Sequence, residues 1–477
     1  MHTAVLLFEI AFAVAVIVLV VAVAVALTRF VVLPLARFVR AVYRFTVAPW
    51  PAKLKYPRVI WYRLRWSWLA RNLGLAHADP RAPVKHRAAI GPAIGRNVRM
   101  ERQNRKLLYP RASFRADRYG VIADIRTRPK VGRLELEQHA QHVADTWRCV
   151  RVQVSQRKPG RVTLRGLDLD PLTELLTMAQ APDGVYQVPD PIRPYLGRDE
   201  WNRHRWLDLP GVTGITIGGL AGYGKTSLIL SLLCQLAPSP AVQFVFIDGR
   251  GGRNYGDYAP WFDRAWMHCG DDLADAAGIF EDLHGHMRKR LSLVSPVLGH
   301  RNAWHLGPTP EWPLIIAIVD ECHTFFDLEA VKGDKTREAQ VRTCRSLGAQ
   351  LVKQQRAALM ITVFITQKQT GDAIPTNIRD NCRIGISFAT RTIDAAIAAL
   401  GEDIRSYLSY SPTQLLDPAY VGVATASLPT GADPFVRLRV PEITEAAADA
   451  RARATARLRS DPDATLAGLI PADPLPA

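Results

Sequence analysis

The residues Gly218–Leu230, GGLAGYGKTSLIL, contain the pattern GxxxxGK[ST]. Glycines let backbone N–H groups approach phosphate oxygens in a tight curve, and the positive end of a following helix dipole adds to the attraction. In such a loop Lys225 reaches the β and γ phosphates, and the Thr226 hydroxyl is a ligand of Mg²⁺. The residues that we expect to bind ATP are Gly219, Leu220, Ala221, Gly222, Tyr223, Gly224, Lys225, Thr226 and Ser227.

Two adjacent acids, Asp320 and Glu321, follow the apolar run LIIAIV. By itself, an apolar strand that ends in two acids is common. If this strand lies one sheet position from the strand before the glycine loop, Asp320 holds the Mg²⁺ shell and Glu321 polarises an attacking water. We therefore predict that the γ-phosphate is transferred to water and not to a small molecule.

A third apolar run, MITVFIT, ends in Thr366-Gln367. An amide at this point can hydrogen-bond the γ-phosphate or the water and report its loss to neighbouring loops, whereas the alternative is a simple strand-end turn. Arg379 and Arg383 precede the next apolar run, and an arginine at a subunit edge can stabilise charge on a neighbouring subunit's nucleotide. We take Arg383 as the candidate; a surface or phosphate-contacting arginine is the alternative.

The elements around these residues alternate between apolar strands and helices. We expect strands near 205–209, 214–218, 241–248, 313–321, 359–367 and 383–390, with helices at 225–236, 271–294 and 338–357. Near-continuous apolar strands separated by helices indicate a parallel sheet that is buried on both faces. The sequence therefore predicts an α/β fold, with a RecA-like P-loop ATPase domain over 190–427.

A smaller basic α/β domain is expected over 76–180, upstream of a proline-rich connector. Its pattern is two strands or a bent hairpin, one helix, LELEQHAQHVADTWR, and two strands around the turn Lys158-Pro159-Gly160. Beyond the motor domain, 428–477 contains an Ala/Arg helix and a Pro/Ala tail that we expect to be mobile.

The N-terminal segment 1–28 is expected to be a transmembrane anchor, because Ile10–Leu27 has no polar residue and is long enough to cross a bilayer with some help from its flanks. A cleaved signal peptide is the alternative, but its first residues should carry Lys or Arg. Ten Lys and Arg residues without an acid follow between Arg29 and Arg71, which predicts that the bulk of the chain is cytoplasmic.

The segment 29–75 also contains several tryptophans and tyrosines among its arginines. This composition suits a helix lying at the level of the lipid headgroups, VIWYRLRWSWLARNLG, although a nucleic-acid contact is an alternative for the same residues. The whole chain of 477 residues has a formal charge of +17, which favours nucleic acid or anionic lipid as a partner over a merely arginine-rich composition.

Several further motifs make the region from Leu207 to Glu402 resemble the FtsK/SpoIIIE family of hexameric DNA-pumping ATPases. They are FVFIDGRGG, MRKRLSLVSPVLGHRN, IVDECHTFF and GAQLVKQQRAALMITVFITQKQ. The upstream α/β unit is similar to the domain that precedes the motor in actinobacterial members from mobile elements, the TraSA-like and TraB-like transfer proteins.

The resemblance implies a membrane-anchored homohexamer that uses ATP and Mg²⁺ to move double-stranded DNA, in conjugative transfer of a plasmid or an integrative element. Four features argue against a chromosome-segregation role. The sequence has one expected span, no long linker and no clear winged helix after Leu416, and it has Lys368 where the family usually has Arg. Two alternatives remain open: an FtsK-like ATPase of a protein secretion system, and a nucleotide-gated membrane scaffold without turnover.

Overall fold

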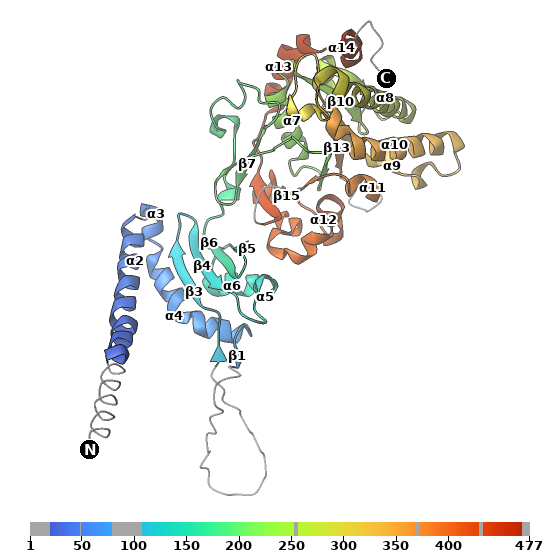
Figure 1. Cartoon of the computed structure of the whole chain (residues 1–477). Helices are drawn as coiled ribbons and strands as arrows, with labels where there is room; N and C mark the ends of the chain where they lie inside the picture. Colours follow the sequence, from blue (N-terminus) through green and yellow to red (C-terminus); the bar gives the residue numbers. More distant parts are fainter. Residues whose placement is uncertain are drawn as a thin grey trace, which may run out of the picture. The chain divides into compact units, whose positions relative to one another are not determined.

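The computed structural model describes residues 20–47, 49–78, 107–251, 256–367, 373–428 and 433–469. The chain divides into two compact units. The first contains the chain up to Gly132 with Gln141–Val152 and Gly160–Leu169, and the second contains Arg133–Ala140, Gln153–Pro159 and the chain from Asp170 onward. Each unit is described by itself (Figure 1).

The first unit begins with a helical stretch over 20–27 that continues through the π-helical turn η1 (Thr28–Val32) into α2 (Leu33–Val47). Large apolar side chains on this stretch are exposed: Val20, Val21, Val23, Val25, Leu27, Val31, Val32, Leu35, Val39 and Val42. No helix among the described residues is both long and apolar enough to cross a membrane. The expected span Ile10–Leu27 lies mostly outside the described residues.

Two further helices, α3 (Trp50–Lys53) and α4 (Tyr56–Asn72), follow. One face of α4 is buried: Tyr62 stacks on Trp147 with ring centroids 4.7 Å apart, and Trp66 Nε1 donates to the Pro110 carbonyl at 2.7 Å. That face therefore belongs to a protein core, and the expectation that the helix lies along a membrane stays a prediction for its other face. The opposite face carries the exposed side chains of Ile60, Trp61, Leu64 and Trp68.

A four-stranded sheet has the order β3-β4-β6-β5. Its strands are β3 (Ala112–Ala116), β4 (Gly120–Arg126), β5 (Arg151–Lys158) and β6 (Arg161–Leu167). The single helix expected before β5 is two helices, α5 (Arg133–Gln138) and α6 (Ala140–Trp147), and a short pair, β1 (His77–Ala78) and β2 (Leu107–Leu108), is antiparallel. Gly120 has to be glycine, because a Cβ there would lie 1.9 Å from the Gly166 carbonyl oxygen.

The second unit is built on a ten-stranded sheet of order β11-β10-β12-β13-β9-β14-β15-β16-β7-β8. The first six strands are parallel, and the last four join by antiparallel pairing, so the sheet is mixed and not purely parallel as expected. The strands are β7 (Tyr195–Asp199), β8 (His204–Trp206), β9 (Gly214–Gly218), β10 (Val242–Asp248), β11 (Ala265–Cys269), β12 (Leu314–Asp320), β13 (Met360–Thr366), β14 (Ile384–Ser387), β15 (Val423–Ser427) and β16 (Phe435–Arg439).

Helices cover both faces of the parallel strands. These helices are α7 (Lys225–Leu236), α8 (Leu273–Leu298), α9 (His323–Phe326), α10 (Lys335–Gln354), α11 (Thr376–Arg379) and α12 (Ile393–Leu400). Because side chains alternate along a strand, Phe244 and Phe246 pack with α7 on one face, and Val245 and Ile247 pack with α8 and α10 on the other. Short 3₁₀ helices include η2 (Pro171–Thr173), η4 (Ala259–Arg264), η7 (Gln355–Ala358), η9 (Leu408–Tyr410), η10 (Pro412–Leu415) and η11 (Pro418–Tyr420).

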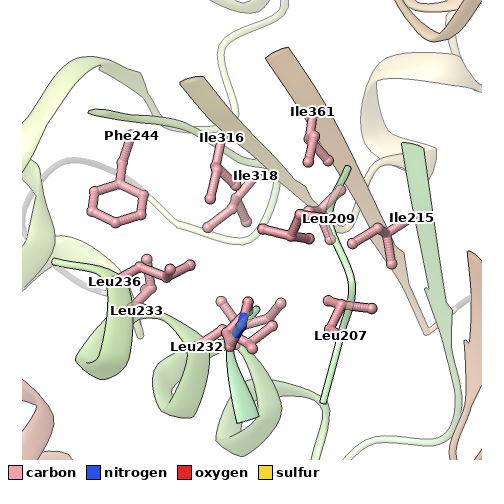
Figure 2. A pocket seen from close by; sticks show the side chains of 13 residues that line it. Leu207, Leu209, Ile215, Leu232, Leu233, Leu236, Phe244, Ile316, Ile318 and Ile361 are labelled. Atoms are coloured by element: carbon pink, nitrogen blue, oxygen red, sulfur yellow. The ribbon is translucent and has the colours of Figure 1, made fainter. Parts of the chain in front are cut away.

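The core between α7 and the sheet encloses a small apolar cavity of about 30 Å³ (Figure 2). Its walls come from α7, represented by Leu232, Leu233 and Leu236, and from strand residues such as Ile316 and Ile361. Because its walls are apolar and offer no partners for a water molecule, this cavity is a packing gap in the core and not a ligand site.

The expected Ala/Arg helix is present in the C-terminal region, and it packs on the second unit. Ala448 and Ala452 of α13 (Glu445–Thr455) and Leu466 of α14 (Pro462–Gly468) belong to the same core as α7. Gln243 Nε2 on β10 donates to the Leu458 carbonyl at 3.1 Å. The second unit therefore extends well past residue 427, and the end of the chain from 470 lies outside the described residues.

Candidate nucleotide site

The glycine loop connects β9 to α7 at the carboxyl edge of the parallel strands. Gly219, Gly222 and Gly224 have φ of 141°, 77° and 109°, values that favour glycine. A Cβ at Gly224 would lie 2.9 Å from the Gly422 Cα, so this position also needs glycine for a close backbone approach. No side chain caps the N-terminus of α7, which leaves its first N–H groups available to an anion.

Lys225 is buried at the first position of α7. Its Nζ donates to the carbonyls of Gly219 and Leu220, both at 2.9 Å. Burial lowers the pKa of Lys225 to about 8, against the attraction of Glu321 and Asp320, which raises it. The lysine is thus within electrostatic reach of both acids, and the glycine loop and the acid pair lie at one place in the fold.

Asp320 is the last residue of β12, and β13 lies between β12 and β9. The acid pair is therefore two sheet positions from the glycine-loop strand and not one. Burial, together with the nearby charges of Glu321 and Asp248, raises the pKa of Asp320 to about 7. A buried carboxylate among other acids is stabilised by a cation, which is the electrostatic condition of a metal ligand.

Glu321 has φ of 43°, a left-handed conformation that is uncommon outside glycine and is often found at functional sites. The Gln367 backbone N–H donates to Glu321 Oε2 at 3.1 Å, and His323 Nδ1 lies 3.4 Å from the same oxygen. Burial raises the pKa of Glu321, but the hydrogen bonds from His323 and Gln367 outweigh it and lower the pKa to about 2. Glu321 is ionised and held in place from the end of β13.

Two charged residues that the sequence analysis did not single out complete this cluster. Arg250 Nη2 lies 3.5 Å from Glu321 Oε1, and its Nη1 lies 3.3 Å from Asp257 Oδ2. Thr226 Oγ1 donates to Asp257 Oδ2 at 3.1 Å. Arg250 lies in FVFIDGRGG. Its position just after an apolar strand that ends in Asp248 could have identified it as a site residue from the sequence.

A cavity of about 240 Å³ adjoins the glycine loop. Its lining includes the predicted residues Gly222, Gly224, Lys225, Thr226 and Ser227 together with Arg250. The remaining lining was not predicted: Leu175, Val421, Gly422, Arg439, Val440, Pro441 and Glu442. Because β15 and β16 pair antiparallel beyond β14, the start of β15 and the end of β16 fall at the same sheet edge as the loop.

The buried Arg439 holds in place the part of the cavity wall that the sequence analysis did not predict. Arg439 donates from Nη2 to the Ala419 carbonyl at 2.8 Å and from Nε to the Leu172 carbonyl. Tyr420 Oη donates to Asp170 Oδ2 at 3.0 Å, and the Glu442 backbone N–H donates to the Leu176 carbonyl at 2.7 Å. The segment after Asp170 therefore forms part of the cavity wall, which no local motif in the sequence indicated.

Arg383 lies away from this cavity. It precedes β14, and because Ile384 pairs with Ile215 at the start of β9, Arg383 is at the amino edge of the sheet, opposite the glycine loop. Its Nη1 donates to the Gly211 carbonyl at 3.3 Å, and its side chain is exposed. Arg383 cannot act on the nucleotide of its own subunit; a role toward a neighbouring subunit stays a prediction. Lys368 lies outside the described residues.

The side chains at the cavity fit Mg²⁺. Among the described residues, no three His, Cys, Asp or Glu side chains are grouped to bind a metal ion on their own. Mg²⁺ is commonly held by one or two carboxylates with substrate phosphates and water, so a full protein ligand set is not required. The Thr226 hydroxyl and the Asp320 carboxylate supply hard oxygen donors of the expected kind.

Comparisons with known proteins show which solved structures have a similar fold. No protein-family model matches the chain, and no curated protein sequence matches it. Among solved structures, the chain is similar to the monomer of the pCW3 conjugation coupling protein TcpA with ATPγS, with 16% identity, 71% of this chain and 90% of that chain covered, and a TM-score of 0.50.

Two secretion ATPases are also among the similar structures. The cytoplasmic domain of the Thermomonospora curvata type VII secretion ATPase EccC has 19% identity, with 62% of this chain and 34% of that chain covered, and a TM-score of 0.44. ATPases 2 and 3 of EssC from Geobacillus thermodenitrificans have 17% identity, with 61% and 52% covered, and a TM-score of 0.42.

At these identities the likeness shows the fold. The second unit has a P-loop ATPase fold, as predicted, and the likeness to the TcpA structure with ATPγS agrees with the predicted resemblance at the level of the fold.

Proposed function

We propose that the chain is a membrane-anchored ATPase that moves double-stranded DNA, in conjugative transfer of a plasmid or an integrative element. One observation carries the proposal. Lys225, Thr226, Asp320, Glu321 and Gln367 lie at one edge of a P-loop ATPase fold, and Lys225 and Thr226 line a cavity of about 240 Å³ there. The fold aligns over 90% of a conjugation coupling protein.

The roles of the side chains follow from their placement. Lys225 and the N-terminal N–H groups of α7 would bind the phosphates, and Thr226 and Asp320 would hold Mg²⁺, which would supply positive charge that neutralises the phosphates. Glu321 is ionised and accepts a hydrogen bond from the attacking water. Gln367 fixes Glu321 from the end of β13, so loss of the terminal phosphate can be reported to the loop that follows β13.

Double-stranded DNA is the cargo that the charge favours. The formal charge of +17 suits the phosphate backbone, and contacts to phosphate would be largely indifferent to base sequence. We propose a homohexameric ring as the working form, because one subunit alone does not encircle DNA and Arg383 lies on an edge where only a neighbour's nucleotide could reach it.

A DNA-stimulated ATPase assay on the full chain in lipid nanodiscs tests the proposal. We expect hydrolysis to rise several-fold with duplex DNA at low salt, and to lose the stimulation between about 50 and 200 mM salt as counterions compete for the phosphates. Lys225→Ala is the inactive control. An ATPase that duplex DNA leaves unchanged, but that a secretion-substrate peptide stimulates, would favour protein cargo; nucleotide binding without hydrolysis would favour a scaffold.

Membrane anchoring has a separate test. The exposed apolar side chains along 20–47, such as Val21 and Val25, continue the apolar run that begins at Ile10. We expect the expressed chain to stay in the membrane pellet after a carbonate wash. The variant Val18→Arg, Val21→Arg should be released, because both positions fall near the middle of Ile10–Leu27 and a charge there costs about 2.5 to 3.5 kcal/mol. Release of the unaltered chain by carbonate would contradict the anchor.

A further inference from the structure

The backbone around Arg250 is attached to the acid pair. The Gly249 N–H donates to the Asp320 carbonyl at 3.0 Å, and the Arg250 N–H donates to Asp248 Oδ1 at 3.0 Å. A Cβ on Gly249 would lie 2.8 Å from the Glu321 carbonyl oxygen, so only glycine permits this approach. The position of Arg250 relative to Asp320 and Glu321 is therefore set by the main chain and not by its side-chain contacts.

The Arg250 side chain links groups that the hydrolysis needs. It pairs with Glu321 at 3.5 Å and with Asp257 at 3.3 Å, and Asp257 accepts the hydroxyl of Thr226 at 3.1 Å. The same guanidinium lines the cavity beside Lys225 and Thr226. Arg250 therefore contacts both Glu321, which is expected to hold the attacking water, and Asp257, which accepts the hydroxyl of the expected metal ligand Thr226.

These ion pairs are easily exchanged. Both exceed the usual 2.7 to 2.9 Å of a strong charge-assisted contact, and the Arg250 side chain is 42% exposed. Partly exposed pairs of this kind contribute little to stability. A terminal phosphate carries more charge than one carboxylate and matches the planar fork of a guanidinium, so it competes well for Arg250.

We propose that Arg250 is a positioning residue that distinguishes a triphosphate from a diphosphate within its own subunit. When ATP enters the cavity, the guanidinium moves from Asp257 and Glu321 to the terminal phosphate. Glu321 then loses its arginine partner and can turn to the water. This inference rests on the proposed function, because it assumes that the cavity takes ATP.

Isothermal titration of the full chain in nanodiscs with Mg²⁺ and either ATPγS or ADP tests the inference. We expect Arg250→Ala to weaken ATPγS binding at least about tenfold and to leave ADP binding within about twofold. Arg250→Lys should recover part of the ATPγS affinity, because it keeps the charge without the fork. Equal weakening for both nucleotides, as a structural role would give, or no change for either, would overturn the inference.

Arg405→Ala is the matched control. Arg405 is an exposed arginine that also pairs with two carboxylates, Asp394 at 2.6 Å and Glu402 at 2.9 Å, and it does not line the cavity. Its removal should leave both affinities unchanged. If the unaltered chain binds neither nucleotide, the proposed function itself fails; if it binds both and Arg250→Ala binds them as well, only the role of Arg250 fails.

A second variant tests the opposite direction. Asp257→Asn removes the carboxylate that competes for Arg250 and Thr226, so ATPγS should bind several-fold more tightly in the presence of Mg²⁺, while ADP binding without Mg²⁺ stays unchanged. This gain cannot come from loss of folding. A weaker affinity for ATPγS would show that Asp257 serves the bound nucleotide, which contradicts the exchange.

Discussion

The two halves of the ten-stranded sheet contribute differently to the candidate nucleotide site. The parallel half supplies reactive groups from strand ends: Lys225 after β9, Asp320 and Glu321 at β12, and Gln367 after β13. The antiparallel half supplies a wall from β15 and β16, with Val421, Val440 and Pro441 as apolar lining. Parallel strands gather their carboxyl ends at one edge, whereas antiparallel strands alternate, so one half concentrates chemistry and the other shapes the cavity.

The comparison implies that the two halves should fail in different ways when they are altered. A change at Glu321 of the parallel half, where the water is expected to be activated, should abolish turnover and spare binding. A change in the wall should lower affinity and spare the chemical step. The following variants test that separation, from the largest expected effect to the smallest.

Glu321→Gln should have the largest effect. The amide cannot accept the proton of the attacking water, so we expect the hydrolysis rate to fall about 10² to 10⁴-fold, with ATPγS affinity little changed. A phosphate-release assay beside a binding titration measures both. Glu329→Gln, at a side chain that is 81% exposed, is the control. A parallel loss of binding would mean that Glu321 shapes the cavity instead.

The attachment of the C-terminal helices to the parallel half should be acid-sensitive. His286 of α8 is buried against Asp463 of α14 at 3.0 Å, and burial together with Arg290 lowers its pKa from 6.5 to about 4 despite Asp463. Between these two values the unfolded chain binds the extra proton, so stability is lost as pH falls from about 6.5 toward 4.

We expect the unaltered chain to lose about 2 kcal/mol more stability than His286→Gln between pH 7 and 5, because Gln does not titrate. Urea unfolding of the two proteins at both pH values measures the difference. Equal losses in the two proteins would mean that the packing of α14 on α8 does not depend on a neutral His286.

Val421→Asp tests the wall. Val421 lines the cavity and is 42% exposed, so a carboxylate there adds negative charge near the bound phosphates without disturbing a core. We expect ATPγS and ADP to bind about tenfold more weakly, with an unchanged unfolding temperature. Leu408→Asp, at a side chain of the same 42% exposure outside the cavity, is the control. Unchanged affinity would remove the antiparallel half from the nucleotide site.

Arg383→Ala should change nucleotide affinity least. The side chain lies at the amino edge of the sheet, so we expect the ATPγS affinity of a single subunit to stay within about twofold. If Arg383 serves a neighbouring subunit, hydrolysis should fall only under conditions where subunits assemble. A large loss of ATPγS affinity in the unassembled chain would mean that Arg383 contacts the nucleotide bound to its own subunit, which would contradict its position at the amino edge of the sheet.

Much of the parallel half could be predicted because its signals are local. The spacing of glycines, lysine and threonine is set by the curve that a phosphate requires, and β9 and α7 begin at Gly214 and Lys225 as expected. Apolar runs ending in Asp320 or in Gln367 identify buried strands and their polar ends. The order of those strands was not predictable, since β13 lies between β12 and β9.

The antiparallel half gave weaker signals. β15 and β16 are five residues each, and the sequence analysis expected no strand in this part of the chain. Arg439, one arginine among many in the sequence, is buried because it donates to carbonyls from two distant segments, at Leu172 and Ala419. Burial of a charged group by long-range partners leaves no trace in local spacing.

The sequence by itself determined the glycine loop, the acid pair and the strands and helices that carry them, because these depend on contacts within a few residues along the chain. Only the tertiary structure decided that β13 separates the two motifs, that Arg250 and Asp257 join them, and that β15 and β16 close the cavity. The physical reason is that strand order and burial depend on contacts between segments far apart in the chain. The hydrophobic pattern and residue spacing of one segment do not specify those contacts.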